Sequence, residues 1–340
     1  MSNRPPIEVP QGAIRLNTDS QKLEFYAQDR WYEMATDVPT LDGGARGVFM
    51  GASVPTGDSQ ISYITIPTQG NAIDFGSRTI SGMGANLSSR TRGLAAGDTA
   101  PTYVNTIDFI TMASTGTCTD FGDRTNTAAR SRGCSNQTRG IWAGGFIAPA
   151  TPNVMDFVTI ASTGNALDFG DLTGNRENPA GNMNSPIRAI WASGDTDGSG
   201  NFSTQIQFVT IATTGNAQNF GDLNGGRSSA AGLSSATRGL IGAGYITPTG
   251  INTIEFITIA TLGNSTDFGD DIMQRGGGIG FFSSPTRTVL GGGNQPSDNE
   301  TNTIAYVQTM TTGNAIDFGD LINHDSAKSG YCVSNGHGGL

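Results

Sequence analysis

The chain has 340 residues, of which 49 are glycine and only 14% are charged, and its formal net charge is −10. High glycine without a Gly-X-Y period excludes collagen, and the absence of any run of Lys or Arg argues against nucleic acid as a partner. The start MSNRPPIEVP has no apolar signal-peptide core, and no stretch approaches the 18 apolar residues of a membrane-spanning helix. We therefore expect synthesis in a cytoplasm and no membrane insertion.

The cysteines Cys118, Cys134 and Cys332 show neither paired nor metal-ligand spacing. Their odd number argues against a disulfide framework. We expect no metal site and no cofactor from these residues.

Residues 12–35 contain three short alternating runs, at Ala13–Leu16, Lys22–Tyr26 and Trp31–Met34, separated by turn-forming residues. This pattern predicts a small β-meander. About 25 residues cannot bury a core alone, so we expect the meander to pack on the main body or on another chain. We expect residues 1–40 to form an anchor and linker and residues 41–340 to form the main domain.

The meander resembles a short β-motif, G-x-I-R-x-N-T followed by E-x-Y and W, that is common in structural and fibre proteins of tailed bacteriophages. The matching residues are Gly12, Ile14, Arg15, Asn17, Thr18, Leu23, Glu24, Tyr26 and Trp31. The resemblance covers under a tenth of the chain. It implies a location on the virion, at the tail or particle surface, after synthesis in a host cytoplasm.

Two short motifs recur six times along the rest of the chain, about 46 to 51 residues apart. The first is Asp-Phe-Gly, or Asn-Phe-Gly in one copy, with its phenylalanine at Phe75, Phe121, Phe169, Phe220, Phe268 and Phe318. The second is an Arg before an apolar run, at Arg46, Arg92, Arg139, Arg188, Arg238 and Arg287. A period of roughly 40–50 residues is typical of a propeller or a solenoid.

Each repeat contains four strand candidates. In the third copy they are Arg139–Gly145, Asn153–Ile160, Ala166–Leu172 and Ala180–Asn184. A Gly-Asn pair lies between the second and third candidates, where we expect it to supply the positive φ of a tight hairpin. Four short antiparallel strands in six copies predict an all-β fold, a six-bladed β-propeller.

The repeat resembles kelch repeats, with an aliphatic strand that ends in a Gly pair, as at Gly144-Gly145 and Gly291-Gly292, followed by N-T-I-x-F. It departs from them because Phe of Asp-Phe-Gly stands in place of the usual Trp. If the strand rich in small residues is innermost, residues 45–76 lack that strand. We therefore expect Tyr331–Asn335 to complete the first blade and close the ring, which removes two unpaired sheet edges.

The candidate chemistry has structural alternatives in each case. Asp-Phe-Gly without a strand Lys or an H-R-D loop does not indicate a kinase; we expect its Phe to pack between blades and its Asp to accept hydrogen bonds from turns or Arg. The recurrent Arg could bind anions, but we favour arginines held by the carboxylates of Asp123, Asp171, Asp222, Asp270 and Asp320.

The loop Asp195–Asn201 resembles the start of a calcium loop, although Ile206 stands where the bidentate Glu belongs. Its Asp-Gly-Ser-Gly is also a good turn, so both interpretations stay open. The only histidines, His324 and His337, form no readable triad or metal cluster. We therefore expect no catalytic residues and no enzyme activity.

The connections after each Gly pair differ in every copy, whereas the other turns are nearly uniform. Variable loops on a rigid scaffold often bind partners, although loops can also vary because nothing constrains them. The best contact candidates are Tyr103, Phe146, Phe202 and Tyr245, since aromatic side chains suit sugar or protein recognition.

Three functions fit these observations. The first is a tailed-phage virion protein that docks on other virion proteins through residues 1–40 and recognises a host-surface glycan or protein with its variable loops. The second is a free carbohydrate-binding or scaffold propeller, and the third is a glycan depolymerase.

Overall fold

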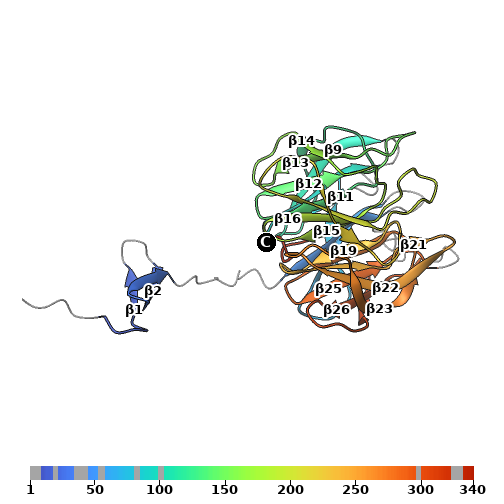
Figure 1. Ribbon diagram of the computed structural model, residues 1–340. Helices are drawn as coiled ribbons and strands as arrows, with labels where there is room; N and C mark the ends of the chain where they lie inside the picture. The colour runs from blue at the N-terminus through green and yellow to red at the C-terminus, as the bar shows by residue number, and fades with distance from the viewer. Residues whose placement is uncertain are drawn as a thin grey trace, which may run out of the picture. The chain divides into compact units, whose positions relative to one another are not determined.

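The computed structural model (Figure 1) describes residues 9–17, 22–33, 45–52, 58–79, 85–98, 103–295, 300–322 and 332–340. These ranges contain the strands β1 to β28 and no helix long and apolar enough to cross a membrane. Internal contacts divide the chain into two units, Met1–Gly43 and Gly44–Leu340. His324, Tyr331 and residues 34–44, which contain the end of the expected anchor and linker, lie outside the described residues.

The N-terminal unit is a three-stranded antiparallel meander of β1 (Ile14–Asn17), β2 (Lys22–Ala27) and β3 (Arg30–Glu33). On one face, Glu24 is buried and accepts hydrogen bonds from Arg15 Nε at 2.8 Å and Asn17 Nδ2 at 2.9 Å. The Arg15 guanidinium also lies 4.1 Å from the centre of the Trp31 ring. This polar face is therefore internally satisfied, and these hydrogen bonds hold the pKa of Glu24 below its usual value.

The strands of the larger unit form six antiparallel sheets, which we number along the chain. Sheets 1 to 3 consist of β28 (Cys332–Ser334), β4 (Arg46–Ala52), β5 (Asp58–Thr65) and β6 (Ile73–Ser77); β7 (Ala85–Ser88), β8 (Arg92–Asp98), β9 (Val104–Thr111) and β10 (Thr119–Asp123); and β11 (Arg132–Ser135), β12 (Arg139–Ala143), β13 (Val154–Thr159) and β14 (Leu167–Asp171).

Sheets 4 to 6 follow the same plan, except that sheet 5 has an extra short strand, β21. They consist of β15 (Ala180–Asn184), β16 (Arg188–Ala192), β17 (Gln205–Thr210) and β18 (Gln218–Asp222); β19 (Ala231–Ser234), β20 (Arg238–Gly242), β21 (Tyr245–Ile246), β22 (Thr249–Thr258) and β23 (Thr266–Arg275); and β24 (Ile279–Ser283), β25 (Arg287–Gly292), β26 (Thr303–Gln308) and β27 (Ile316–Asp320).

The two ends of the larger unit meet in sheet 1, where β28 pairs with β4 so that Cys332 lies opposite Phe49 and Ser334 opposite Gly47. This is the pairing that the phase of the repeat predicts. The strands rich in small residues contact one another in sequence: β7 with β11, β11 with β15, β15 with β19, β19 with β24, β24 with β28, and β28 with β7. In Figure 1, β11, β15 and β19 lie near the middle of the larger unit, with β13 and β14 above them and β25 and β26 below.

The hydrophobic core lies between neighbouring sheets rather than inside one of them. One cluster, for example, joins Phe169 and Met155 of sheet 3 to Trp191 and Ile211 of sheet 4. A corresponding cluster joins sheet 6 to sheet 1 through Phe282 and Phe49. Because each sheet contributes to two clusters, its middle strands carry apolar residues on both faces, as buried strands should.

Hydrogen bonds link the ends of the innermost strands into a continuous series. The hydroxyl of Ser135 donates to the backbone carbonyl oxygen of Ser88 at 2.7 Å, and the hydroxyl of Ser88 donates to the backbone carbonyl oxygen of Ser334 at 2.8 Å. In the same way, the hydroxyls of Ser334, Ser283 and Ser234 donate to the backbone carbonyl oxygens of Ser283, Ser234 and Asn182, respectively. The backbone N–H of Ser135 donates to the side-chain oxygen of Asn184. Sequence alone shows these serines only as part of a segment of small residues.

Asp-Phe-Gly has a structural role in each outer strand. Its phenylalanine is buried and meets the aromatic ring of the neighbouring strand edge-on, as Phe169 meets Phe157 at 5.8 Å between centroids. The same pair recurs in every sheet, with tyrosine as the partner in sheets 1 and 6. Phe169 of sheet 3 also packs in one hydrophobic cluster with residues of sheet 4, as expected for a Phe between neighbouring sheets.

The Gly-Asn turn joins neighbouring sheets. Gly215 has a φ of +150° and its N–H donates to the carbonyl oxygen of Phe169, in the preceding sheet, at 2.7 Å. Asn216 Oδ1 accepts the backbone N–H of Asp171 at 3.0 Å. The positive φ expected of the Gly-Asn pair is therefore found at its Gly, and the Asn contributes its side-chain oxygen.

The recurrent arginines do not pair with the expected carboxylates. Arg139 stacks 4.5 Å above the centre of the Phe157 ring, and its Nη1 donates to the carbonyl oxygen of Ile211 in the next sheet at 2.9 Å. The other five arginines make the same kind of stack and reach the next sheet in the same way. Their role is structural, but their partners are π faces and carbonyl oxygens.

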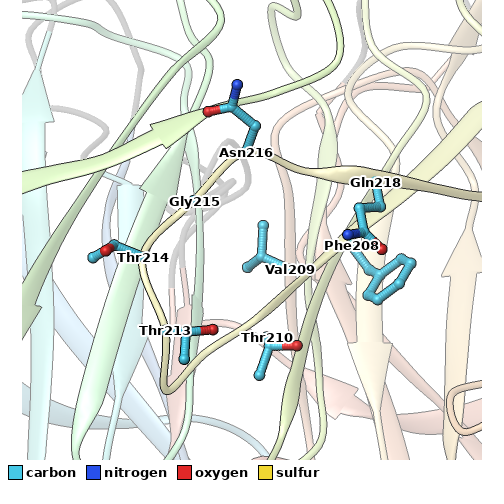
Figure 2. Close-up of a pocket in the computed structure, with 8 residues that line it drawn as sticks. All are labelled: Phe208, Val209, Thr210, Thr213, Thr214, Gly215, Asn216 and Gln218. Atoms are coloured by element: carbon cyan, nitrogen blue, oxygen red, sulfur yellow. The ribbon is translucent and has the colours of Figure 1, made fainter.

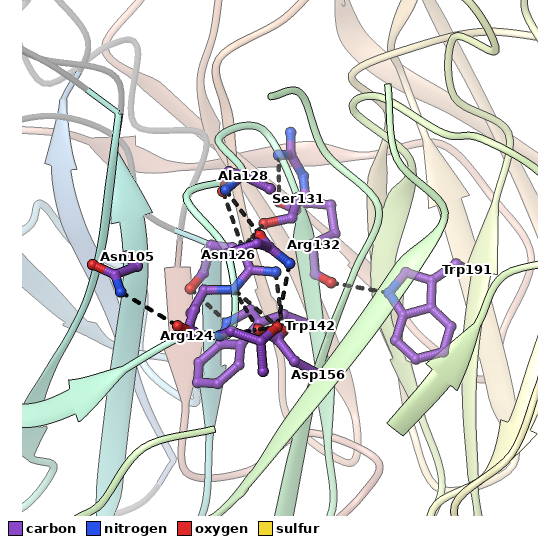
Figure 3. A network of polar contacts seen from close by, with 11 residues as sticks. Asn105, Arg124, Asn126, Ala128, Ser131, Arg132, Trp142, Asp156 and Trp191 are labelled. Carbon is purple, nitrogen blue, oxygen red and sulfur yellow. Dashed lines mark hydrogen bonds and ion pairs between the residues drawn. The ribbon is translucent and has the colours of Figure 1, made fainter. Parts of the chain in front are cut away.

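A second set of arginines makes buried ion pairs across three of the sheet boundaries. Arg124, after β10, binds Asp156 of β13 through Nε and Nη2, the latter at 3.0 Å, with both side chains fully buried (Figure 3). Its Nη1 donates to the Ala128 carbonyl oxygen and the Ser131 hydroxyl. Equivalent pairs are Arg78 with Asp108 and Arg227 with Glu255. Between sheets 3 and 4, Gln207 stands at the position that an acidic residue holds in the other pairs. The corresponding arginine there is Arg176, whose pKa is lowered by burial.

The last residues of the chain cross the ends of the innermost strands. His337 Nε2 lies 2.9 Å from the carbonyl oxygen of Ser88, and the Gly338 N–H donates to that of Ser234 at 3.0 Å. A Cβ on Gly339 would lie 2.0 Å from the carbonyl oxygen of Ser135. This tail, Asn335–Leu340, therefore contacts several sheets at once.

Candidate functional site

The loops that differ between sheets bring the four sequence-selected aromatic residues together as two pairs. The ring centroids of Tyr103 and Phe146 are 6.1 Å apart at 60°, and those of Phe202 and Tyr245 are 6.1 Å apart at 82°. Tyr103 is 36% exposed and the other three are partly exposed. Each pair therefore presents aromatic surface to solvent.

The two pairs are built in the same way. Phe146 follows Gly144-Gly145 and Tyr245 follows Ala243-Gly244, and each forms a bridge with the segment that precedes the innermost strand of its own sheet. The amide of Phe146 donates to the Ala129 carbonyl at 2.7 Å, and that of Tyr245 to the Ser228 carbonyl at 2.8 Å. The partner ring comes from the end of the variable loop in the preceding sheet. Both pairs thus span a boundary between neighbouring sheets.

Charged groups flank the first pair. The Arg130 guanidinium lies 5.8 Å from the centre of the Phe146 ring and forms an ion pair with Glu177. The side chain of Arg130 is 45% exposed, whereas that of Glu177 is 7% exposed. Sequence reasoning missed both residues, because each occurs once rather than in every repeat; their only signal is that they precede an innermost strand. A cation beside an exposed aromatic face suits a ligand with both apolar and hydrogen-bonding groups.

The loop Asp195–Asn201 lies beside the second pair, since Asp195 bridges to Phe202. Its carboxylates accept hydrogen bonds from the loop itself: Asp195 Oδ1 from the Gly198 amide at 3.0 Å and Oδ2 from the Gly200 amide at 2.8 Å. Asp197 accepts from the Asn201 side chain and the Ser199 amide, and these bonds lower its pKa. The described ranges hold no group of three His, Cys, Asp or Glu side chains suited to a metal ion.

The uniform turns carry a different feature, a pocket enclosed by the wide hairpin between the last two strands. In sheet 4 it measures about 260 Å³, and Figure 2 shows Val209 pointing into the loop while Asn216 points away. Its lining is uncharged: Phe208, Val209, Thr210, Thr213, Thr214, Gly215, Asn216 and Gln218. Sheets 2 and 3 carry the equivalent pocket at about 90 and 200 Å³. The aromatic floor is covered, since Phe208 is 8% exposed beneath Arg188.

The buried titratable groups of the larger unit include cysteine thiols and ion-paired side chains. Burial raises the pKa of the Cys118 and Cys134 thiols to about 12, which keeps them protonated and unreactive at neutral pH. The buried Arg124, Asp156, Arg227 and Glu255 are held in ion pairs.

A scan against protein-family models finds no match to this chain, and a search of the curated proteins finds none.

Proposed function

We propose that this protein is a non-enzymatic virion structural protein of a tailed phage, associated with the tail or a fibre. In this proposal the larger unit is a closed six-bladed β-propeller that displays its variable loops for recognition of a host-surface glycan or protein. The N-terminal meander docks on other virion proteins. The two quasi-equivalent aromatic pairs on the variable loops are the observation that carries the recognition role.

The closed ring rests on three sets of contacts. The innermost strands contact one another from β7 through β28 and back to β7. The serine hydrogen bonds follow the same path. In addition, the outer turn of sheet 1 is joined to sheet 6, because the Gly70 amide donates to the Phe318 carbonyl oxygen at 3.1 Å. A ring of this kind leaves only short outer edges and holds each loop in a fixed position.

Recognition by the variable loops is supported by the type of surface they offer. Partly exposed aromatic rings supply contact area at low conformational entropy cost, and carbohydrate-binding or protein-binding surfaces use such rings beside hydrogen-bonding groups. Anchoring by the meander is supported by its resemblance to motifs of phage structural proteins and by its length, since about 25 residues are too few to bury a core alone.

Two experiments test the proposal. Mass spectrometry of purified particles should find the protein, and deletion of residues 1–40 should remove it from particles while the remaining chain stays soluble and folded. Absence of the full-length protein from particles would contradict a virion role and favour a free carbohydrate-binding or scaffold propeller.

The recognition surface is tested on immobilised host-surface glycans. Phe146→Ala and Tyr245→Ala should each lower binding at least tenfold, whereas the matched exposed change Leu262→Ala on a uniform turn should leave it unchanged. A reducing-sugar assay on the same glycans separates binding from cleavage; release of sugar would show that the protein is a depolymerase.

A further inference from the structure

The boundary between sheets 3 and 4 contains a buried arginine for which the described residues provide no carboxylate. Arg176 is the seventh residue after the phenylalanine of its Asp-Phe-Gly motif, and Arg227 is the seventh after that of Asn-Phe-Gly. Both are buried, with 5% and 3% of their surface exposed. Arg227 forms an ion pair with Glu255 of β22, whereas β17 carries the neutral Gln207 at the position of Glu255.

The hydrogen bonds of Arg176 are made to neutral acceptors. Its Nη1 donates to the carbonyl oxygen of Asn175 at 2.6 Å, and its Nη2 donates to the side-chain oxygen of Gln205 at 2.8 Å. Burial lowers the pKa of Arg227 as well, but there the carboxylate of Glu255 acts in the opposite direction. The pKa of Arg176 is lowered by burial alone. A buried charge without a counter-ion is costly, so this boundary needs a source of negative charge.

Gln207 offers a donor where Glu255 offers an acceptor. The Oε1 of Gln207 accepts the backbone N–H of Thr173 at 2.8 Å and the Thr173 hydroxyl at 2.9 Å. Its Nε2 is buried and has no partner among the described residues. The opposite orientation of the amide would set its NH₂ against the Thr173 N–H, which is also a donor. The unpaired Nε2 therefore takes the place of the Glu255 oxygen that binds Arg227.

The strand next to Gln207 has lost a carboxylate as well. Gln207 lies opposite Asn219 in the strand register, whereas Asp156 and Glu255 lie opposite Asp168 and Asp267. Sheet 4 thus has two neutral amides where sheets 3 and 5 have two acids. The region around the buried arginine is correspondingly more positive than the equivalent regions of the neighbouring sheets.

The acidic residues that lie next to Arg176 are engaged with other groups. Glu177 follows it in the chain and forms an ion pair with Arg130. Asp195 bridges to Glu177 through the backbone, and both of its carboxylate oxygens accept hydrogen bonds from amides of its own loop. These carboxylates therefore do not replace the missing partner of Arg176.

The space beside the guanidinium is open on one side. A Cβ built on Gly174 would meet one atom within 4 Å, Arg176 Nη1 at 3.4 Å. Gly174 itself is partly exposed. This side therefore gives a small ion a route from solvent to the buried arginine.

We propose that a small monovalent anion of the chloride class binds at this boundary, between the Arg176 guanidinium and Gln207 Nε2. The anion has the electrostatic role toward Arg176 that Glu255 has toward Arg227. A water molecule would accept the Gln207 N–H but would leave the charge of Arg176 uncompensated. One buried positive charge favours a single negative charge over a multivalent anion. The proposal is independent of the virion and recognition roles.

The test is urea unfolding of the full-length chain in sodium chloride from about 1 to 300 mM, with sodium gluconate, a bulky monovalent anion, keeping the ionic strength constant. An anion that binds only the folded state stabilises it by mass action. Above the dissociation constant, the unfolding equilibrium constant should fall about tenfold for each tenfold rise in chloride. Equal stability of the wild-type chain in chloride and in gluconate would overturn the proposal.

Gln207→Glu supplies the missing carboxylate within the chain. This variant should be more stable than wild type in gluconate, and its stability should not change with chloride. Gln218→Glu is the matched control, because it makes the same charge change at an exposed position of β18; it should keep the wild-type response. A chloride response that survives in Gln207→Glu, or that is lost in Gln218→Glu, would contradict binding beside Arg176.

Bromide locates the ion directly. In crystals grown from sodium bromide, the anomalous signal should show a peak between Arg176 and Gln207 in the wild-type protein and none there in Gln207→Glu. Bromide peaks confined to the exposed surface would overturn the proposal.

Discussion

His337 Nε2 lies 2.9 Å from the backbone carbonyl oxygen of Ser88, which is 249 positions earlier in the chain. His337 Nδ1 accepts the Gly339 N–H at 3.1 Å, so the neutral ring carries its proton on Nε2 and donates it to Ser88. The neighbouring groups, Ser135 and Asn184, are also uncharged. The C-terminal tail is thus fixed by a histidine that is bound in its neutral form.

This arrangement predicts a pH dependence of stability. Burial lowers the pKa of His337 from 6.5 to about 4, so between these values the unfolded chain binds one more proton than the folded chain. The contribution of the neutral ring is complete above pH 6.5, is lost as the pH falls toward 4, and reaches roughly 3 kcal/mol.

The measurement is the free energy of unfolding in urea at several pH values between 4 and 7. His337→Asn should unfold more easily than wild type at pH 7, and the difference should shrink toward pH 4. The carboxylates titrate in both proteins, so their contributions to the free energy of unfolding cancel in this comparison. A difference that is constant with pH would show that His337 is not bound as a neutral ring.

The C-terminal strand predicts a second effect. Deleting residues 332–340 removes the partner of β4 and the tail, and leaves a sheet edge unpaired. We expect the free energy of unfolding to fall by roughly 3 kcal/mol or more, with a lower midpoint and increased aggregation. Thermal unfolding followed by circular dichroism measures this, and deletion of residues 1–40 serves as the control. Equal midpoints for the full-length and C-terminally deleted chains would contradict the proposed closed ring.

The Arg124–Asp156 pair predicts a graded series. Asp156→Leu leaves a buried guanidinium without its anion and should cost about 3–5 kcal/mol. Asp156→Gln copies the residue at the equivalent position in sheet 4, Gln207, and should cost less because its amide oxygen still accepts from Arg124. The double change Arg124→Met/Asp156→Leu should recover much of the loss.

Chemical denaturation of the three variants provides the measurement. If Asp156→Leu and the double variant were equally destabilised, the cost would come from packing rather than from an unpaired charge.

The glycine of Asp-Phe-Gly predicts a sharp positional contrast. Gly170 has a φ of +135°, and a Cβ there would lie 2.7 Å from the backbone of Gly215 in the next sheet. Gly170→Ala should therefore destabilise the protein by roughly 2 kcal/mol or more. Gly225 has no positive φ and nothing within 4 Å of its Cβ position, so Gly225→Ala should be neutral or slightly stabilising. Equal melting temperatures for the two variants would show that the turn does not lie against Gly170.

Much of the architecture follows from local pattern. Alternating apolar residues and turn residues placed the strands of the third repeat within two residues of β12, β13, β14 and β15, because period-2 patterning is a property of each strand alone. The repeat phase likewise predicted the pairing of the C-terminal segment with β4, since a missing strand in one copy has to be supplied from elsewhere in the chain.

The partners of individual side chains could not be predicted in the same way. The arginines were expected to meet carboxylates, yet Arg139 stacks on Phe157 and donates to a carbonyl of the next sheet. The Gly-Asn pair was expected only to shape the turn, yet Asn216 also holds a neighbouring strand through its side chain. Both contacts cross a boundary between sheets, so they depend on how two separate repeats are placed and not on spacing within one.

The same distinction applies to the candidate site. Sequence singled out Tyr103, Phe146, Phe202 and Tyr245 as variable-loop aromatics, and only folding brought them into two pairs and placed Arg130 beside one of them. Sequence by itself determined the repeat, its strands and the faces each strand presents, because these follow from covalent order and the pleat. Tertiary structure alone decided which residues of neighbouring sheets touch and that the final histidine binds Ser88, because such contacts form between segments whose separation in the chain carries no local signal.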